Sequence, residues 1–128
     1  MNLQTHIPFS KETNNLIDYN SKIILLGSCF SENIGKKFRY LKFQSVQNPF
    51  GILFHPKAIE TIIKNAINKK KYTKIDVFLL NELWQSFEAH SQLSYSSKEE
   101  IIQQLDKAAI TINKALKSSI HIINTLGT

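Results

Sequence analysis

The most constraining feature of this chain is an unbroken apolar run, Ile23–Leu26, set between Lys22 and Gly27. Consecutive apolar residues, with no polar residue at alternate positions, are typical of a strand that is covered on both faces, as in a parallel sheet. Gly27 ends the run, and Ser28 follows as a residue that can cap a helix. The stretch therefore predicts a buried strand that passes directly into a helix.

The helix after this turn is indicated by apolar residues at helical spacing, Phe30, Ile34 and Phe38. Residues 41–51 alternate in character and predict a second strand, which Asn48 and Pro49 would stop. A second helix is expected from Pro56, because alanines and isoleucines form a continuous stripe over residues 58–67.

The second half of the chain is expected to add a small excursion, a long helix and a last strand. Residues 72–96 are compatible with a short strand pair that turns near Asn81 and Glu82, or with a helix and a loop, and we expect the strand pair. Residues 96–119 predict a long amphipathic helix capped by serine. The last nine residues are apolar and β-branched and predict another buried strand. Residues 1–20 are polar and are expected to be an extended lead-in.

This order of strands and helices predicts an α/β fold, with a parallel sheet flanked by helices, in a single domain over residues 1–128. Such sheets bind ligands beyond the carboxyl ends of their strands. The loops that begin at Gly27, at Asn48–Gly51 and at Gly127 should meet there. We therefore expect the functional site at that edge of the sheet.

Composition narrows the class of protein. A content of 42% hydrophobic and 20% charged residues is typical of a globular protein and excludes a disordered chain. No run approaches the roughly 18 apolar residues of a membrane span, and the start lacks a secretory pattern, so we expect a cytoplasmic protein without a membrane partner. The lysines between residues 68 and 74 lack interleaved aromatics, which favours a solvated helix end over a nucleic-acid-binding surface.

The single cysteine, Cys29, excludes an internal disulfide and a site with several thiolates. His6, His55 and His121 lack the spacing of metal ligands, so we expect neither a metal nor a cofactor. From the residues alone, Cys29 is either a small buried residue at a tight corner or a thiol whose reactive thiolate is favoured by a helix N-terminus.

The stretches "LLGSCFSENIG", "NPFGILFHP", "LWQSFEAHS" and "IINTLGT" occur in this order over nearly the whole chain. Together they resemble the N-terminal part of GSCFA-domain proteins, a family similar to the SGNH (GDSL-like) esterases and acyl hydrolases. The resemblance implies an incomplete three-layer sandwich, similar to the SGNH-hydrolase and flavodoxin-like folds. It also implies a hydrolase that acts on ester or acyl bonds of a small molecule or a glycan.

The resemblance assigns roles to particular residues. In SGNH enzymes the first block reads Gly-Asp-Ser, and its serine is the nucleophile. The matching residues here are Gly27, Ser28 and Cys29, so Cys29 is the expected nucleophile, with Ser28 as a second candidate or as the helix cap. Gly51, or Asn48 before it, is expected to contribute to the oxyanion hole. Their alternative role is a simple turn.

The remaining blocks are expected to line the substrate pocket, through Trp84, His90, Gly127 and Thr128. For Trp84 and His90 the alternative is a packing and hydrogen-bonding role. SGNH enzymes take their catalytic aspartate and histidine from a C-terminal block, which this sequence does not show. We therefore expect a catalytically incomplete fragment whose last strand has an unpaired edge. The alternative function is a small α/β module that binds an anionic ligand at a helix N-terminus.

Overall fold

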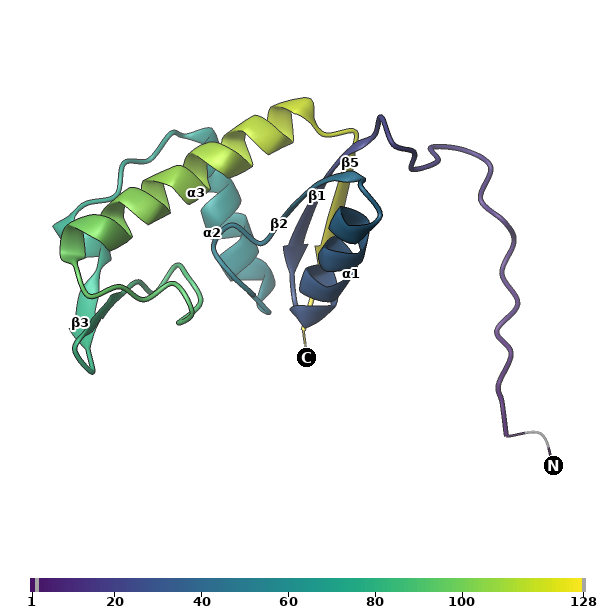
Figure 1. The fold of residues 1–128 in the computed structure, drawn as a ribbon, viewed down its shortest axis with the longest axis horizontal. Coiled ribbons are helices and arrows are strands. Elements are labelled where there is room, and N and C mark those ends of the chain that lie inside the picture. The colour runs from purple at the N-terminus through teal and green to yellow at the C-terminus, as the bar shows by residue number, and fades with distance from the viewer. Residues whose placement is uncertain (2, 128) are drawn as a thin grey trace.

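The computed structural model describes residue 1 and residues 3–127, and it confirms the predicted α/β class. Three parallel strands form one sheet in the order β2-β1-β5, with β1 at Lys22–Gly27, β2 at Gln44–Gln47 and β5 at His121–Thr125 (Figure 1). Ile24 of β1 lies opposite Val46 of β2 and Ile122 of β5, so the apolar run occupies the centre of the sheet.

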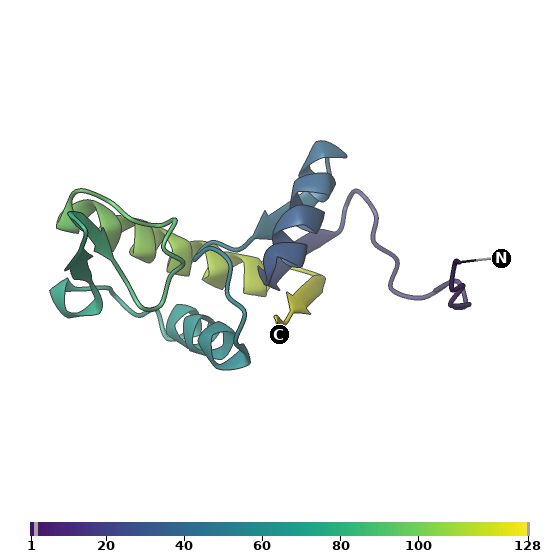
Figure 2. The same ribbon diagram turned by 90° about the horizontal axis from the view of Figure 1, so that it is seen from below.

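Three helices flank the sheet: α1 (Cys29–Tyr40), α2 (Pro56–Ile67) and α3 (Lys98–Ser118). The sheet lies between α1 on one side and α2 on the other, and α3 runs from the sheet to the far end of the molecule (Figures 1 and 2). Every residue of β1 after Lys22 is buried, as expected for a strand covered on both faces. This arrangement is an incomplete α/β sandwich.

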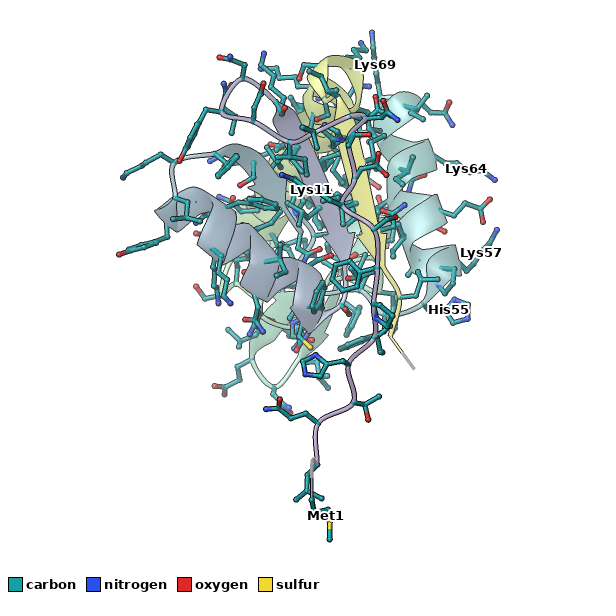
Figure 3. The ribbon with its side chains drawn as sticks, turned by 90° about the vertical axis from the view of Figure 1, so that its right-hand side faces the viewer. Met1, Lys11, His55, Lys57, Lys64 and Lys69 are labelled. Carbon is teal, nitrogen blue, oxygen red and sulfur yellow. The ribbon has the colours of Figure 1, made fainter. Side chains whose placement is uncertain are left out.

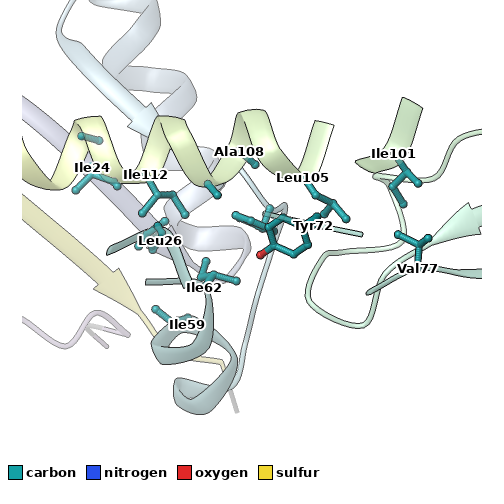
Figure 4. Close-up of a cluster of buried hydrophobic side chains, with 14 residues drawn as sticks. Ile24, Leu26, Ile59, Ile62, Tyr72, Val77, Ile101, Leu105, Ala108 and Ile112 are labelled. Carbon is teal, nitrogen blue, oxygen red and sulfur yellow. The ribbon is translucent and has the colours of Figure 1, made fainter. Parts of the chain in front are cut away.

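The hydrophobic core forms where β1 meets α2 and α3. Ile24 and Leu26 of β1 contact the apolar stripes that the sequence predicts on both helices (Figure 4). The side chain of Phe50, which follows the second strand, is fully buried in the same cluster. The core therefore fixes the loop after β2 against the sheet, next to the turn at Gly27.

The excursion between α2 and α3 is the expected strand pair. Strands β3 (Phe78–Leu80) and β4 (Leu83–Gln85) are antiparallel and are joined by Asn81 and Glu82, whose φ angles are 50° and 63°. Two consecutive positive φ angles define the tight hairpin turn that suits twisted strands. A single turn of 3-10 helix, Lys74–Asp76, precedes the hairpin. Figures 1 and 2 show the hairpin at the N-terminal end of α3, away from the sheet.

Some predicted boundaries are wrong. The second strand covers only residues 44–47 of the predicted 41–51, because Leu41 ends α1 and Lys42 adopts a φ of 67°. Phe43 instead packs against Tyr19 and Phe38. The last strand is also not buried as predicted, because every second residue of β5 is exposed.

The lysine-rich segment after α2 is only partly the solvated helix end that the sequence predicts. The Nζ of Lys70 lies 2.7 Å from Glu88 and 2.9 Å from Asp76, and its side chain is 27% exposed. Lys69 and Lys71 on either side of it are exposed.

Residues 3–20 form the expected lead-in without a helix or strand. Within the described residues, none of the helices has the length and apolar character needed to cross a bilayer.

Candidate active site

The turn from β1 to α1 is built around Gly27. Its φ is 134°, and a Cβ at this position would overlap the backbone carbonyl of Thr125 in β5. Only glycine allows this close approach of the two strands. The turn therefore places Ser28 and Cys29 at the carboxyl edge of the sheet, where the sequence predicts the site.

Ser28 forms a buried group of hydroxyls with residues that the sequence analysis missed. Its Oγ lies 2.9 Å from Oγ1 of Thr125, which in turn lies 2.7 Å from Oγ of Ser31. Ser28 also caps α1, because its Oγ accepts a hydrogen bond from the Phe30 N–H at 3.3 Å. The Ser28 hydroxyl is thus occupied by structural hydrogen bonds. The one sequence signal that could have indicated this group of hydroxyls is the position of Ser31, three residues after Ser28.

Cys29 differs from Ser28 in its surroundings. It is the first residue of α1, and its side chain is exposed to solvent rather than packed in the corner. The first-turn N–H groups of Phe30 and Glu32 donate to Ser28, through its side chain and its carbonyl. Within the described residues, the N–H groups of Cys29 and Ser31 have no acceptor. A solvent-facing thiol therefore lies beside the unpaired N–H of its own residue at a positive helix end, whereas Ser31 is fully buried.

Asn48 connects the loop after β2 to this turn. Its Oδ1 accepts a hydrogen bond from the Gly27 N–H at 2.8 Å, and its Nδ2 donates to Glu32 of α1 at 3.2 Å. Its backbone N–H donates to Leu25 at 3.0 Å. These bonds hold the turn in place, and Nδ2 of Asn48 uses one of its two N–H groups in the bond to Glu32.

Gly51 lies in the same loop, beside His90. Its φ is 79°, and a Cβ there would lie 2.5 Å from Cβ of His90. The Gly51 N–H donates to the Asn48 carbonyl at 2.8 Å, as in the turn that was the alternative role. The next loop residues follow the strand edge, because the Leu53 N–H donates to the Gly27 carbonyl at 2.9 Å.

The structure separates the two residues of the "LWQSFEAHS" block. The half-buried His90 is anchored to the second loop, since its N–H donates to the Phe50 carbonyl at 2.9 Å. Its Nδ1 accepts a hydrogen bond from the Gln92 N–H at 3.1 Å. Trp84 instead belongs to the hairpin, where the Lys98 ammonium lies 4.3 Å from the centre of its ring. Trp84 therefore lies away from the turn at Gly27.

The chain after β5 joins the same edge. The Gly127 N–H donates to the Phe54 carbonyl at 3.1 Å, and a Cβ on Gly127 would overlap the Phe54 ring. The three predicted loops therefore do lie together. Thr128, the last predicted pocket residue, lies outside the described residues. In the part of the chain that the structure describes, no group of three or more His, Cys, Asp and Glu side chains could hold a metal ion.

The fold and this edge define a class: an α/β sandwich with a thiol at the first strand-to-helix turn and two glycine loops beside it. A scan of protein-family models matches the GSCFA family over residues 22–128. The chain therefore belongs to the GSCFA family. Searches of curated proteins and of solved structures found no match.

Proposed function

We propose that this protein is an SGNH-like hydrolase or acyltransferase of ester or acyl bonds, in which Cys29 is the nucleophile. The observation that supports Cys29 over Ser28 is the contrast in their surroundings. The Ser28 hydroxyl is buried and bonded to Thr125, whereas the Cys29 thiol is exposed at the helix N-terminus. Ser28 then acts as the helix cap. The Cys29 sulfur attacks the substrate carbonyl to form a thioester, the bond to the leaving alcohol breaks, and the thiol proton passes to that alcohol; water or an acceptor alcohol then cleaves the thioester.

The oxyanion of the resulting intermediate requires donors close to the nucleophile. The N–H group of the exposed Cys29, which lacks an acceptor in the described residues, meets this need, whereas Ser31 is fully buried. The Gly51 N–H, the donor expected from the family resemblance, would have to share its bond to Asn48. In this proposal Gly51 contributes by allowing His90 close to the loop, and His90 and Gly127 line the substrate pocket.

The general base of an SGNH-like site would come from a further strand and helix packed on β5. This part of the proposal is supported by β5 itself, which pairs only with β1 in the described residues. Ile122 and Leu126, in and after this strand, are 51% and 57% exposed. A sheet edge with exposed apolar residues is a natural place for a further strand. We expect residues 1–128 alone to form a covalent acyl adduct but to turn over poorly.

Alkylation of Cys29 tests the nucleophile. Iodoacetamide should react with the folded chain at pH 7 faster than with the chain unfolded in urea, because the proposed nucleophile is exposed at a helix N-terminus, the kind of surroundings in which reactive cysteines are found. p-Nitrophenyl acetate should acetylate Cys29, as shown by intact-mass measurement, and the Cys29→Ser variant should lose this adduct. Ser28→Ala is the matched control, which should keep the adduct. A folded thiol that reacts no faster than the unfolded one would contradict the proposal.

A non-enzymatic anion-binding module is the alternative, because the unpaired N–H group of Cys29 at the start of α1 would hold an anion. Inorganic phosphate would then raise the melting temperature of both the original chain and the Cys29→Ser variant. The hydrolase proposal instead expects the acetyl adduct and little stabilisation by phosphate.

A further inference from the structure

We propose that a groove between α2 and α3, far from Cys29, binds a single-chain amphiphilic anion such as a fatty-acid carboxylate. The groove has a volume of about 410 Å³. We call it the basic groove and define it by an apolar floor and three lysines: Ala66, Ala109, Ile110, Lys69, Lys114 and Lys117. Its size falls in the range of roughly 300–1,000 Å³ that is usual for small-molecule sites.

The shape of the basic groove follows from the sequence of α3. Ile110, Lys114 and Lys117 recur at helical spacing and therefore lie on one face, which turns toward the end of α2. Asn113 on the same face donates from Nδ2 to the Ala66 carbonyl at 2.8 Å, and so fixes α3 against the last turn of α2. The two walls are thus held together without an occupant.

The charge of the basic groove is one-sided. All ionisable residues that line it are lysines. Lys70 is neutralised by Glu88 and Asp76, and the exposed Lys71 lies 3.9 Å from Asp106. Lys69, Lys114 and Lys117 have no carboxylate partner in the described part of the chain. Three uncompensated ammonium groups around one groove favour an anionic occupant.

The floor of the groove selects the kind of anion. Ala66 and Ala109 are 1% and 4% exposed, and Ile110, beside them, is 48% exposed. A free phosphate would leave this apolar surface in water, and a nucleic acid would need aromatic stacking partners or an extended row of cations. An alkyl chain against Ile110 and the methylene stems of the lysines, above the buried alanines, with its head group among the ammonium groups, uses both properties of the groove.

The basic groove is independent of the proposed active site. Figure 3 shows His55 and Lys69 at opposite ends of α2, and the loop that joins the Gly27 turn lies at the His55 end. A helix of 12 residues separates the two sites by about 18 Å. Binding in the groove can therefore be tested independently of catalysis at Cys29.

Calorimetric titration of the 128-residue chain with sodium dodecanoate, below its micelle concentration, tests the proposal. We expect saturable binding at one site, and much weaker binding of inorganic phosphate and of neutral dodecyl maltoside. The double variant Lys114→Glu/Lys117→Glu should weaken dodecanoate binding by roughly tenfold or more, because it removes charge-assisted contacts. Ile110→Asn should also weaken it, by removing part of the floor.

The control is Lys11→Glu/Lys37→Glu, which changes net charge equally at exposed lysines outside the groove and should leave dodecanoate binding unchanged. Circular dichroism of each variant confirms that it is folded. Equal binding of dodecyl maltoside, or equal losses in both double variants, would overturn the proposal. The proposal would also be overturned if the chain bound duplex DNA or anionic vesicles through Lys114 and Lys117 but did not bind dodecanoate.

Discussion

Asn48 and Gly27, which are 21 residues apart in the chain, are joined by a buried hydrogen bond of 2.8 Å from the Gly27 N–H to the Asn48 Oδ1. This bond fixes the loop after β2 against the turn that presents Cys29. Asn48 is 8% exposed and also bonds to Glu32 of α1. One side chain thus connects a strand end, a loop and a helix at the proposed active site.

Asn48→Ala should therefore destabilise the protein. It leaves the buried Gly27 N–H without an acceptor, which costs about 1–3 kcal/mol of the free energy of unfolding. Urea denaturation measures this change. Asn33→Ala is the matched control, because Asn33 lies on the exposed face of α1 and its replacement should be neutral or slightly stabilising. Equal stability of both variants would show that the hydrogen bond to Gly27 makes no net contribution to the free energy of unfolding.

Gly27→Ala should be costlier than Gly35→Ala. At Gly27 the added methyl group would overlap the Thr125 backbone, and the φ of 134° is unfavourable for alanine, so we expect a loss on the order of 3 kcal/mol. At Gly35 the methyl group would meet the Gln47 side chain, whose amide end can rotate away, although its Cβ, 2.9 Å away, would require a small shift. Thermal or urea unfolding compares the two variants, and a smaller loss for Gly27→Ala would contradict the described packing of β5 on β1.

Glu82→Gly should stabilise the hairpin. Asn81 and Glu82 both have positive φ angles, and Asn-Gly is the preferred pair in this turn. Replacing Glu82 removes a backbone conformation that costs a non-glycine residue roughly 1–2 kcal/mol, which exceeds the roughly 0.5–1 kcal/mol entropic cost of glycine. Urea denaturation should show this gain, whereas Glu82→Ala, which keeps the positive φ with a Cβ, should show none. A loss of stability in Glu82→Gly would contradict the turn.

Asp76→Asn should remove a pH-dependent part of stability. Burial alone would raise the pKa of Asp76, but the hydrogen bond and charge of Lys70 and the Thr73 N–H together lower it. Because the folded pKa lies below the unfolded value, the charged Asp76 stabilises the protein above that value. This stabilisation is lost as the pH falls from about 5 through the folded pKa.

The Asp76→Asn variant should accordingly be less stable than the original chain at pH 7, and the difference should shrink as the pH is lowered, as measured by urea denaturation at several pH values. Glu82→Gln is the control, because Glu82 is exposed and has no ion pair in the described residues. A difference between Asp76→Asn and the original chain that stays constant with pH would contradict the role of this carboxylate.

The elements near β1 could be predicted from local pattern, because a short apolar run and a capping serine are local signals. The length of β2 and the exposure of β5 could not be predicted from local pattern. β2 is short because Leu41 ends α1, Lys42 adopts a positive φ, and Phe43 stacks on Tyr19, which is 24 residues away in the chain. β5 has the composition of a buried strand, but burial depends on what lies beside it, and only β1 does so in the described residues.

The site shows the same division. The position of Cys29 at a helix N-terminus follows from the sequence, because glycine, serine and the helical spacing all occur within a few residues. The partners of Ser28 do not, since Thr125 is 97 residues away. The separation of Trp84 from His90 could not be predicted from the sequence either, because the hairpin places two residues of one sequence block in different surroundings.

By itself, the sequence determined the α/β class, the serine caps of α1 and α3 and the position of a thiol-bearing turn at the carboxyl edge of a parallel sheet. These features depend on residues that are close in the chain and on the way parallel strands align. Only the tertiary structure decided that the Ser28 hydroxyl is bonded and the Cys29 thiol exposed, that Asn48 holds Gly27, and that lysines of α3 meet Lys69. Hydrogen bonds and charge clusters of this kind form between distant segments, so they exist only once the chain has packed.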